Sequence, residues 1–103
     1  MVEPTRSIVT VLGSTKFRKE IIQWAWENTK RGFLVLFAPF AKEEIADVEA
    51  NRQELEIQHF QKMRMSNWVM VFNKNGYIGE STKREIQYAK DHHILIQYLE
   101  SIP

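Results

Sequence analysis

The sequence predicts one α/β domain in which a parallel sheet of four or five strands lies between two layers of helices. First, its 103 residues are the length of a single domain. Second, four short apolar runs alternate with segments of helical periodicity, which is typical of β-α-β units with parallel strands. Third, the runs are continuously apolar, as expected of strands covered on both faces. We therefore expect a three-layer α/β/α sandwich, with residues 1–103 as one domain.

The predicted strands are rich in β-branched and aromatic residues and end at turn residues. They cover residues 7–12, 33–37, 68–72 and 94–99. The first run ends at Gly13, the second stops before Pro39, and the third ends at the Asn-Lys-Asn-Gly sequence of residues 73–76. These endings favour short strands separated by turns.

Three helices are predicted between the strands, at residues 16–30, about 51–63 and 82–90. Gly32 is expected to end the first helix. Residues 39–50, which precede the second helix, are interpreted as a mobile flap. One stripe of the first helix is expected to face the core, and it consists of Phe17, Ile21, Trp24, Ala25 and Asn28.

The predicted strand order is 2-1-3-4, as in flavodoxin-like sheets. In this order the first and third strands are neighbours, and ligands bind beyond their carboxyl ends, where the direction of winding changes. The turns that leave these two strands, residues 13–15 and 73–82, are the most polar glycine-bearing turns in the chain. The sequence therefore predicts a site at this edge of the sheet.

Composition excludes several classes of function. The chain has no Cys, which rules out disulfides, thiolate metal sites and a Cys nucleophile, and fits a cytoplasmic protein. A formal charge of +1 without a basic cluster argues against nucleic-acid polymers and membranes as partners. Residues 1–6 lack the pattern of a signal peptide, and no apolar run approaches the length of about 20 residues that spans a bilayer. The three His show no metal-ligand spacing, so neither a metal nor a cofactor is expected.

The turn Gly13-Ser14-Thr15 joins a strand to the start of a helix. Backbone N–H groups, hydroxyls and the helix dipole would suit a phosphate or a sugar hydroxyl there, with Lys16 or Arg18 adding positive charge. Alternatively, Ser14 or Thr15 only caps the helix. The two interpretations are about equally favoured by the sequence.

The segment 75–89 carries the strongest candidate for catalysis, Glu85. We expect Glu85 in the first turn of the last helix, where the dipole favours the carboxylate form that a nucleophile needs. However, Thr82-x-x-Glu85 also matches a capping box, in which the glutamate only folds back onto its own helix start. Spacing alone favours the capping box.

The aromatic residues divide into core and surface candidates. Phe40 and Tyr77 lie just past strand ends, where a base could stack on them. Trp24 and Trp68 are expected in the core. Trp26 falls off the apolar stripe and is a candidate for a subunit interface.

Three blocks of the chain resemble small bacterial and phage proteins of the nucleoside 2-deoxyribosyltransferase-like family. These blocks are Val-Leu-Gly-Ser-Thr-Lys-Phe at 11–17, His-Phe-Gln-Lys at 59–62, and Gly-Tyr-Ile-Gly-Glu-Ser-Thr-Lys-Arg-Glu-Ile-Gln-Tyr-Ala at 76–89. The last block is the most specific, and the likeness spans nearly the whole chain. The resemblance implies a flavodoxin-like fold and a homodimer that acts on a nucleoside or a nucleoside 5′-monophosphate.

In this family a glutamate attacks C1′ of the sugar and forms a glycosyl-enzyme, which passes the sugar to another base or to water. That glutamate lies in a Gly-Thr-x-x-Glu-φ-Gly-Tyr-Ala pattern, where φ is apolar, and residues 81–89 are similar to it. The resemblance therefore implies that Glu85 is the nucleophile. The residues expected to bind substrate are Gly13, Ser14, Thr15, Arg18, Phe40, Asn67, Asn73, Tyr77, Gly79, Ser81 and Thr82.

The chain departs from the family pattern at four positions. Asn67 stands where an acid is usual, Gly79 where an aspartate helps to protonate or position the base, and Ser81 where the pattern has glycine. A further acid is common one or two helix turns before Asn67, and the nearest candidates here are His59 and Arg64. Asn can donate and accept hydrogen bonds but cannot act as an acid. The order of hypotheses is thus an N-glycosidase or deoxyribosyltransferase, then a non-catalytic nucleotide-binding module, then a small structural or interaction protein.

Overall fold

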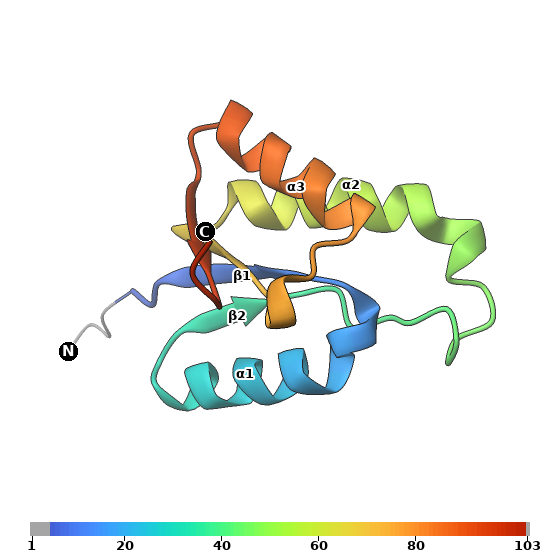
Figure 1. Ribbon diagram of the computed structural model, residues 1–103, viewed down its shortest axis with the longest axis horizontal. Coiled ribbons are helices and arrows are strands. Elements are labelled where there is room, and N and C mark those ends of the chain that lie inside the picture. Colours follow the sequence, from blue (N-terminus) through green and yellow to red (C-terminus); the bar gives the residue numbers. More distant parts are fainter. Residues whose placement is uncertain (1–4, 103) are drawn as a thin grey trace.

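The computed structural model describes residues 5–102 and contains a four-stranded, all-parallel sheet (Figure 1). The strand order is β2-β1-β3-β4, which confirms the predicted 2-1-3-4 topology. Val9 pairs with Val35 on one side and with Trp68 on the other, so β1 and β3 lie side by side at the centre. The strands are β1 (Ile8–Leu12), β2 (Leu34–Leu36), β3 (Trp68–Val71) and β4 (Leu95–Tyr98).

The helices form two layers, one on each face of the sheet, as predicted. Figure 1 shows α1 (Arg18–Lys30) on one face, with α2 (Arg52–Arg64) and α3 (Glu80–Asp91) on the other. Three single turns of 3-10 helix complete the chain: η1 (Thr15–Phe17), η2 (Glu49–Asn51) and η3 (Lys74–Gly76). Gly32 follows the end of α1 with a φ of +97°, a conformation that favours glycine, so its predicted role as the stop is confirmed.

Apolar side chains pack on both faces of the central strands. Neighbouring residues of a strand point to opposite faces, and accordingly Val11 packs on the α1 side while Leu12 packs on the α2–α3 side. The cluster on the α2–α3 side consists of Leu12, Met63, Val69, Val71, Ile86 and Ala89. The cluster on the α1 side consists of Val11, Phe17, Ile21 and Phe72.

The edge strands are less covered than their apolar sequences predicted. Leu34 in β2 is 49% exposed and Leu95 in β4 is 72% exposed. An edge strand has one neighbour instead of two. Leu95 lies on the α1 face, because its neighbour Ile96 packs on the α2–α3 side, and α1 is the only α-helix of residues 5–102 on that face. Leu34 lies on the α2–α3 face, because its neighbour Val35 packs on the α1 side. The expectation of coverage on both faces is therefore correct for β1 and β3 and wrong for the edges.

The stripe of α1 faces the core as expected, with Ile21, Ala25 and Asn28 buried and Trp24 half-buried. Trp68 is also only half-buried, and its ring meets Phe33 edge-on, with 5.3 Å between centroids. Neither tryptophan is fully in the core, because both lie near the less covered part of the α1 face. No helix within residues 5–102 has the length and apolarity needed to cross a membrane.

Candidate functional site

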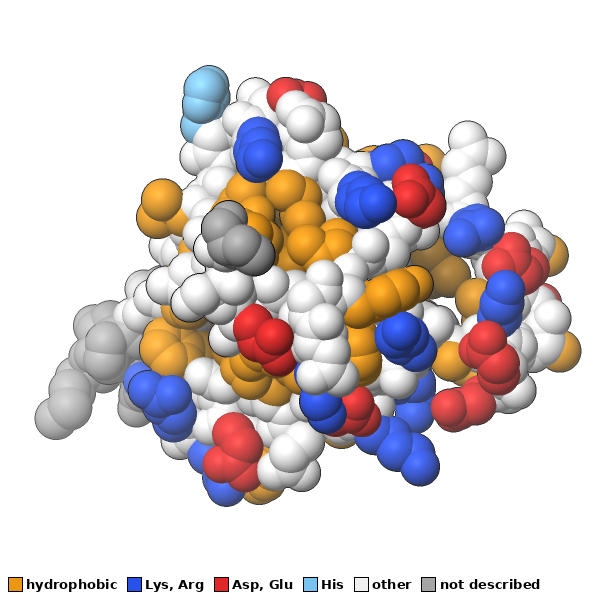
Figure 2. All heavy atoms as spheres, in the orientation of Figure 1, with side chains coloured by type: hydrophobic (Ala, Val, Ile, Leu, Met, Phe, Trp, Pro, Cys, Tyr) orange, Lys and Arg blue, Asp and Glu red, His pale blue; other side chains and the backbone are white. Residues whose placement is uncertain are grey.

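A cavity of about 500 Å³ opens beyond the carboxyl ends of β1 and β3, where the strand order predicts a site. Its walls come from the turns that follow these strands, from α2 and α3, and from the chain between β2 and α2. In Figure 2 it is a hollow with hydrophobic side chains at its floor and charged side chains at its rim. The predicted site residues that line it are Gly13, Ser14, Thr15, Phe40, Tyr77, Gly79, Ser81, Thr82 and Glu85.

The start of α3 differs from the prediction. Gly79 is the N-cap, with an extended backbone at φ −76° and ψ 170°, and the helix begins at Glu80. Thr82 is therefore inside the first turn, where it is 3% exposed, and Glu85 lies in the second turn. The capping box of Thr82 and Glu85, and the first-turn position of Glu85, are both wrong because the helix begins two residues earlier than expected.

Glu85 does not cap the helix, and its side chain faces His59 of α2. Glu85 Oε1 lies 3.5 Å from His59 Nε2, and the two side chains are 16% and 8% exposed. This distance is longer than the 2.7–3.2 Å of a good N–H···O hydrogen bond, so the contact is a close electrostatic one. His59 Nδ1 is buried and has no hydrogen-bond partner among the described residues. The carboxylate thus stands in the cavity wall with an imidazole beside one of its oxygens.

A charged pair joins the same two helices nearer the surface. Arg84 of α3 lies 3.6 Å from Glu56 of α2, and both side chains are about half exposed. Glu56 precedes His59 by roughly one helical turn, while Arg84 is the neighbour of Glu85 in sequence. The family resemblance pointed to His59 or Arg64 where a further acid is usual, but the packing of α2 against α3 is what brings His59 to Glu85.

The turn after β1 takes the conformation of a helix cap. Ser14 Oγ accepts a hydrogen bond from the backbone N–H of Lys16 at 3.2 Å, so the capping interpretation of Ser14 is confirmed. The hydroxyl proton of Ser14 is not used in this bond, and both Ser14 and Thr15 line the cavity. A Cβ at Gly13 would lie 3.0 Å from both Ile21 Cδ1 and Phe72 Cβ, so a larger residue would force these neighbours to shift.

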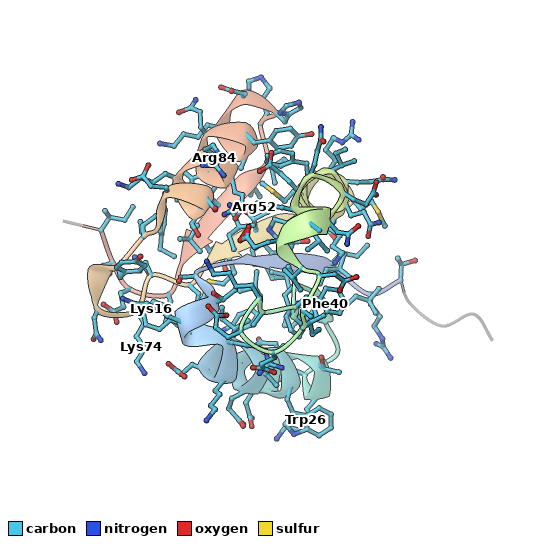
Figure 3. All side chains as sticks on the ribbon, turned by 90° about the vertical axis from the view of Figure 1, so that its right-hand side faces the viewer. Lys16, Trp26, Phe40, Arg52, Lys74 and Arg84 are labelled. Carbon is cyan, nitrogen blue, oxygen red and sulfur yellow. The ribbon has the colours of Figure 1, made fainter. Side chains whose placement is uncertain are left out.

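Tyr77 is held against the start of η1 by its ring. Its ring meets Phe17 in a T-shaped contact at 6.0 Å, and the Lys16 ammonium lies 3.4 Å from the Tyr77 centroid. In Figure 3 the labelled Phe40 lies on the opposite side of the view from Lys16, and Phe40 lines the cavity as Tyr77 does. Tyr77 and Phe40 are 42% and 47% exposed, so apolar ring surface borders the cavity entrance.

Asn67 and Asn73 do not line the cavity. Asn67 precedes β3 at the opposite edge of the sheet, where its Oδ1 accepts a hydrogen bond from the backbone N–H of Ile8 at 2.7 Å. Asn73 is 3% exposed and makes two hydrogen bonds with the backbone of Glu100, donating from Nδ2 at 3.0 Å and accepting at Oδ1 at 2.8 Å. Both amides complete backbone hydrogen bonding, which is why they lie away from the predicted site.

Arg18 is also directed away from the cavity lining. Its Nε donates to the Pro39 carbonyl oxygen at 3.0 Å, and its Nη1 lies 3.2 Å from Glu44 Oε1. The guanidinium thus contacts the chain that follows β2, where the sequence suggested a phosphate ligand. This chain, residues 39–51, consists of turns and η2 and is called the wall segment from here on.

The wall segment and the first two turns of α2 bring to the cavity several charged residues that the sequence analysis did not single out. They are Lys42, Glu49, Arg52 and Glu56, together with Glu80 of α3. Lys42 and Arg52 both lie near Glu49, at 3.9 and 3.7 Å. Because the wall segment has no regular periodicity, no local pattern could have assigned these side chains to the site.

No group of three or more His, Asp or Glu side chains within residues 5–102 is placed to hold a metal ion. Comparison of the chain with protein-family models, with curated proteins and with solved structures finds no match in any of the three. The resemblance to the nucleoside 2-deoxyribosyltransferase-like family therefore stays a prediction.

Proposed function

We propose that the protein cleaves or transfers the N-glycosidic bond of a nucleoside, deoxynucleoside or nucleoside 5′-monophosphate, with Glu85 as the nucleophile. One observation carries this proposal: a mostly buried carboxylate faces a cavity at the carboxyl edge of the sheet, and within residues 5–102 its ion-pair contact is with His59 alone. Glu85 makes no capping bond that would explain its position structurally.

The proposed reaction has two displacements at C1′ of the sugar. A Glu85 carboxylate oxygen attacks C1′, and the C1′–N bond breaks with its electron pair going to the base nitrogen, which takes up a proton from water; the nucleophile of the second displacement returns a proton to water. The product is a glycosyl ester on Glu85. Water or a second base then attacks C1′, the ester bond breaks, and the Glu85 carboxylate is restored.

The cavity offers groups that suit such a substrate. Its volume of about 500 Å³ lies within the range of small-molecule sites. Hydroxyls of Ser14, Thr15 and Ser81 can bind a sugar or a phosphate, while the rings of Tyr77 and Phe40 can cover a base. His59, at Glu85 Oε1, would hold the carboxylate so that its other oxygen is directed to C1′.

The proposal is tested by incubating a panel of nucleosides and 5′-monophosphates with the protein at high concentration, with and without a free acceptor base. Products are separated by chromatography, and intact-protein mass spectrometry looks for the glycosyl ester. The variants are Glu85→Gln and, as a matched control, Glu54→Gln, which removes an α2 carboxylate that does not line the cavity. Free base released by the wild type and by Glu54→Gln, but not by Glu85→Gln, is the expected result.

The acceptor lanes decide between the two forms of the reaction. A new nucleoside makes the protein a transferase, whereas free base alone makes it a hydrolase. Unchanged substrate in every lane, with nucleotide binding retained in calorimetry, contradicts the proposal and favours the non-catalytic binding module. Absence of binding as well favours a structural or interaction protein.

A further inference from the structure

The chain that leaves β2 is held by cations from both faces of the sheet. Lys62 of α2 donates from Nζ to the Phe37 carbonyl oxygen at 3.2 Å. Arg18 of α1 donates from Nε to the Pro39 carbonyl oxygen at 3.0 Å. Because α1 and α2 lie on opposite faces (Figure 1), the two bonds direct the chain out of the sheet and into the wall segment.

The wall segment depends on few polar contacts with the rest of the molecule. Its backbone hydrogen bonds are local, such as those from the N–H groups of Glu44 and Ile45 to the Ala41 carbonyl oxygen at 3.0 Å. Among residues 5–102, Arg18 alone connects residues 39–48 to α1 or to the sheet by a hydrogen bond or ion pair. Burial of Ala41, which is 5% exposed, adds an apolar contact.

The wall segment forms one side of the cavity, because Phe40, Lys42, Val48 and Glu49 all line it. In Figure 3 the wall segment, which includes the labelled Phe40, crosses in front of the sheet below Arg52. Its position therefore decides how much of the cavity is enclosed. Loss of its one polar connection to α1 would leave the Glu85 side of the cavity intact and release the opposite side.

We propose that Arg18 is a positioning residue that holds the wall segment against the body and thereby sets the affinity of the cavity for its substrate. The guanidinium suits this role because its planar fork donates in two directions, to the Pro39 carbonyl and to the Glu44 carboxylate. The effect on the segment is independent of any reaction. Its effect on KM rests on the proposed function, because it requires that the cavity be the substrate site.

The effect on the segment is measured by hydrogen exchange of the amides of Glu44, Ile45 and Val48 in the free protein. In Arg18→Ala their exchange is expected to rise about tenfold, the low end for hydrogen bonds to charged groups, since the Arg18 side chain is 30% exposed. Glu44→Gln leaves the Pro39 bond and is expected to raise exchange by less than about threefold, as for surface ion pairs. Arg18→Lys is expected to fall between these two variants.

Lys30→Ala is the matched control, because it removes one positive charge from the same helix at a pair with Glu27. It should leave exchange in the wall segment unchanged. Exchange in Arg18→Ala that stays at the wild-type rate in residues 41–48 overturns the proposal. Equal acceleration in the segment and in β1 and β3 also overturns it, because Arg18 would then be a general structural residue.

The catalytic consequence is measured on whichever nucleoside the wild type cleaves. Arg18→Ala should raise KM about tenfold and change kcat by less than about threefold, because uniform binding is lost while the reacting groups stay in place. A fall in kcat with KM unchanged would contradict the positioning role. The exchange experiment needs no substrate, so it tests the Arg18 proposal by itself. The Glu85→Gln experiment tests the glycosidase proposal, so the two proposals can fail separately.

Discussion

Substitution of His59 tests whether the imidazole positions Glu85. His59→Leu removes the polar neighbour of Glu85 Oε1, which lies 3.5 Å from Nε2, and keeps an apolar side chain in a site that is 8% exposed. His59→Gln keeps an amide N–H donor that can face the same oxygen. Comparison of the two variants separates the effect of losing the polar contact with Glu85 from the effect of losing the imidazole ring.

The two variants should differ more in kcat than in stability. In His59→Leu a mostly buried carboxylate loses its polar neighbour, which costs about 1–3 kcal/mol of unfolding free energy. Part of this cost is offset because leucine also removes the buried Nδ1 that has no partner among the described residues. We therefore expect a net loss below about 2 kcal/mol. Misplacement of the nucleophile by about 1 Å should lower kcat about 100-fold.

Unfolding in urea gives the free energies, and steady-state rates on the cleaved nucleoside give kcat and KM. His59→Gln should keep kcat within about tenfold of the wild type, since a polar side chain still lies beside Glu85. His92→Leu, on an exposed histidine after α3, is the control and should leave kcat unchanged. A kcat of His59→Leu within about threefold of the wild type would refute the reasoning, because Glu85 would then need no neighbour to hold it.

Three further predictions concern residues whose roles the structure separates. Gly13→Ala brings a methyl group to 3.0 Å from Ile21 Cδ1 and should lower the unfolding free energy by about 1–3 kcal/mol. The methyl group of Gly79→Ala meets nothing nearer than 3.5 Å, so this variant should change the unfolding free energy by less than about 1 kcal/mol. Equal losses of the two variants in urea unfolding would contradict this contrast. Asn67→Ala removes the acceptor of the 2.7 Å hydrogen bond from Ile8 N–H and should lower the unfolding free energy by about 1 kcal/mol. Its kcat/KM should stay within about twofold of the wild type. A larger change in kcat/KM would indicate that Asn67 contributes to the site. Asn73→Ala removes two hydrogen bonds to the Glu100 backbone and should lower the unfolding free energy by about 2–3 kcal/mol, which lowers the thermal midpoint. KM of the folded protein should not change. A raised KM would contradict the structural role of Asn73.

The strands were predictable because each depends on a local rule, whereas their order was predicted by choosing the flavodoxin-like arrangement of a parallel sheet. Continuous apolar runs ended by glycine or proline mark buried strands, and alternation with helices makes the sheet parallel. The structure confirms each strand to within one or two residues at its ends. The carboxyl edge of β1 and β3 was predictable from that order, which places the turns 13–15 and 77–82 together.

The start of α3 was not predictable from its pattern, although the residues were correctly singled out. Gly79, Ser81 and Thr82 can each precede a helix. The burial of Thr82 to 3% exposure places it inside the first turn, and the extended Gly79 becomes the cap. A capping box is a local motif, but tertiary packing decided which of these residues begins the helix.

The sequence by itself determined the alternation of strands and helices and the positions of the polar turns, because periodicity and turn chemistry act over a few residues. The order of the sheet was predicted from the usual arrangement of such folds, and the structure confirms it. Only the tertiary structure decided that His59 faces Glu85 and that Arg18 holds the wall segment instead of lining the cavity. These contacts join residues of α2 with α3 and of α1 with an irregular chain. Which faces of packed helices meet depends on their side chains fitting together across the fold, and no spacing along one helix contains that information.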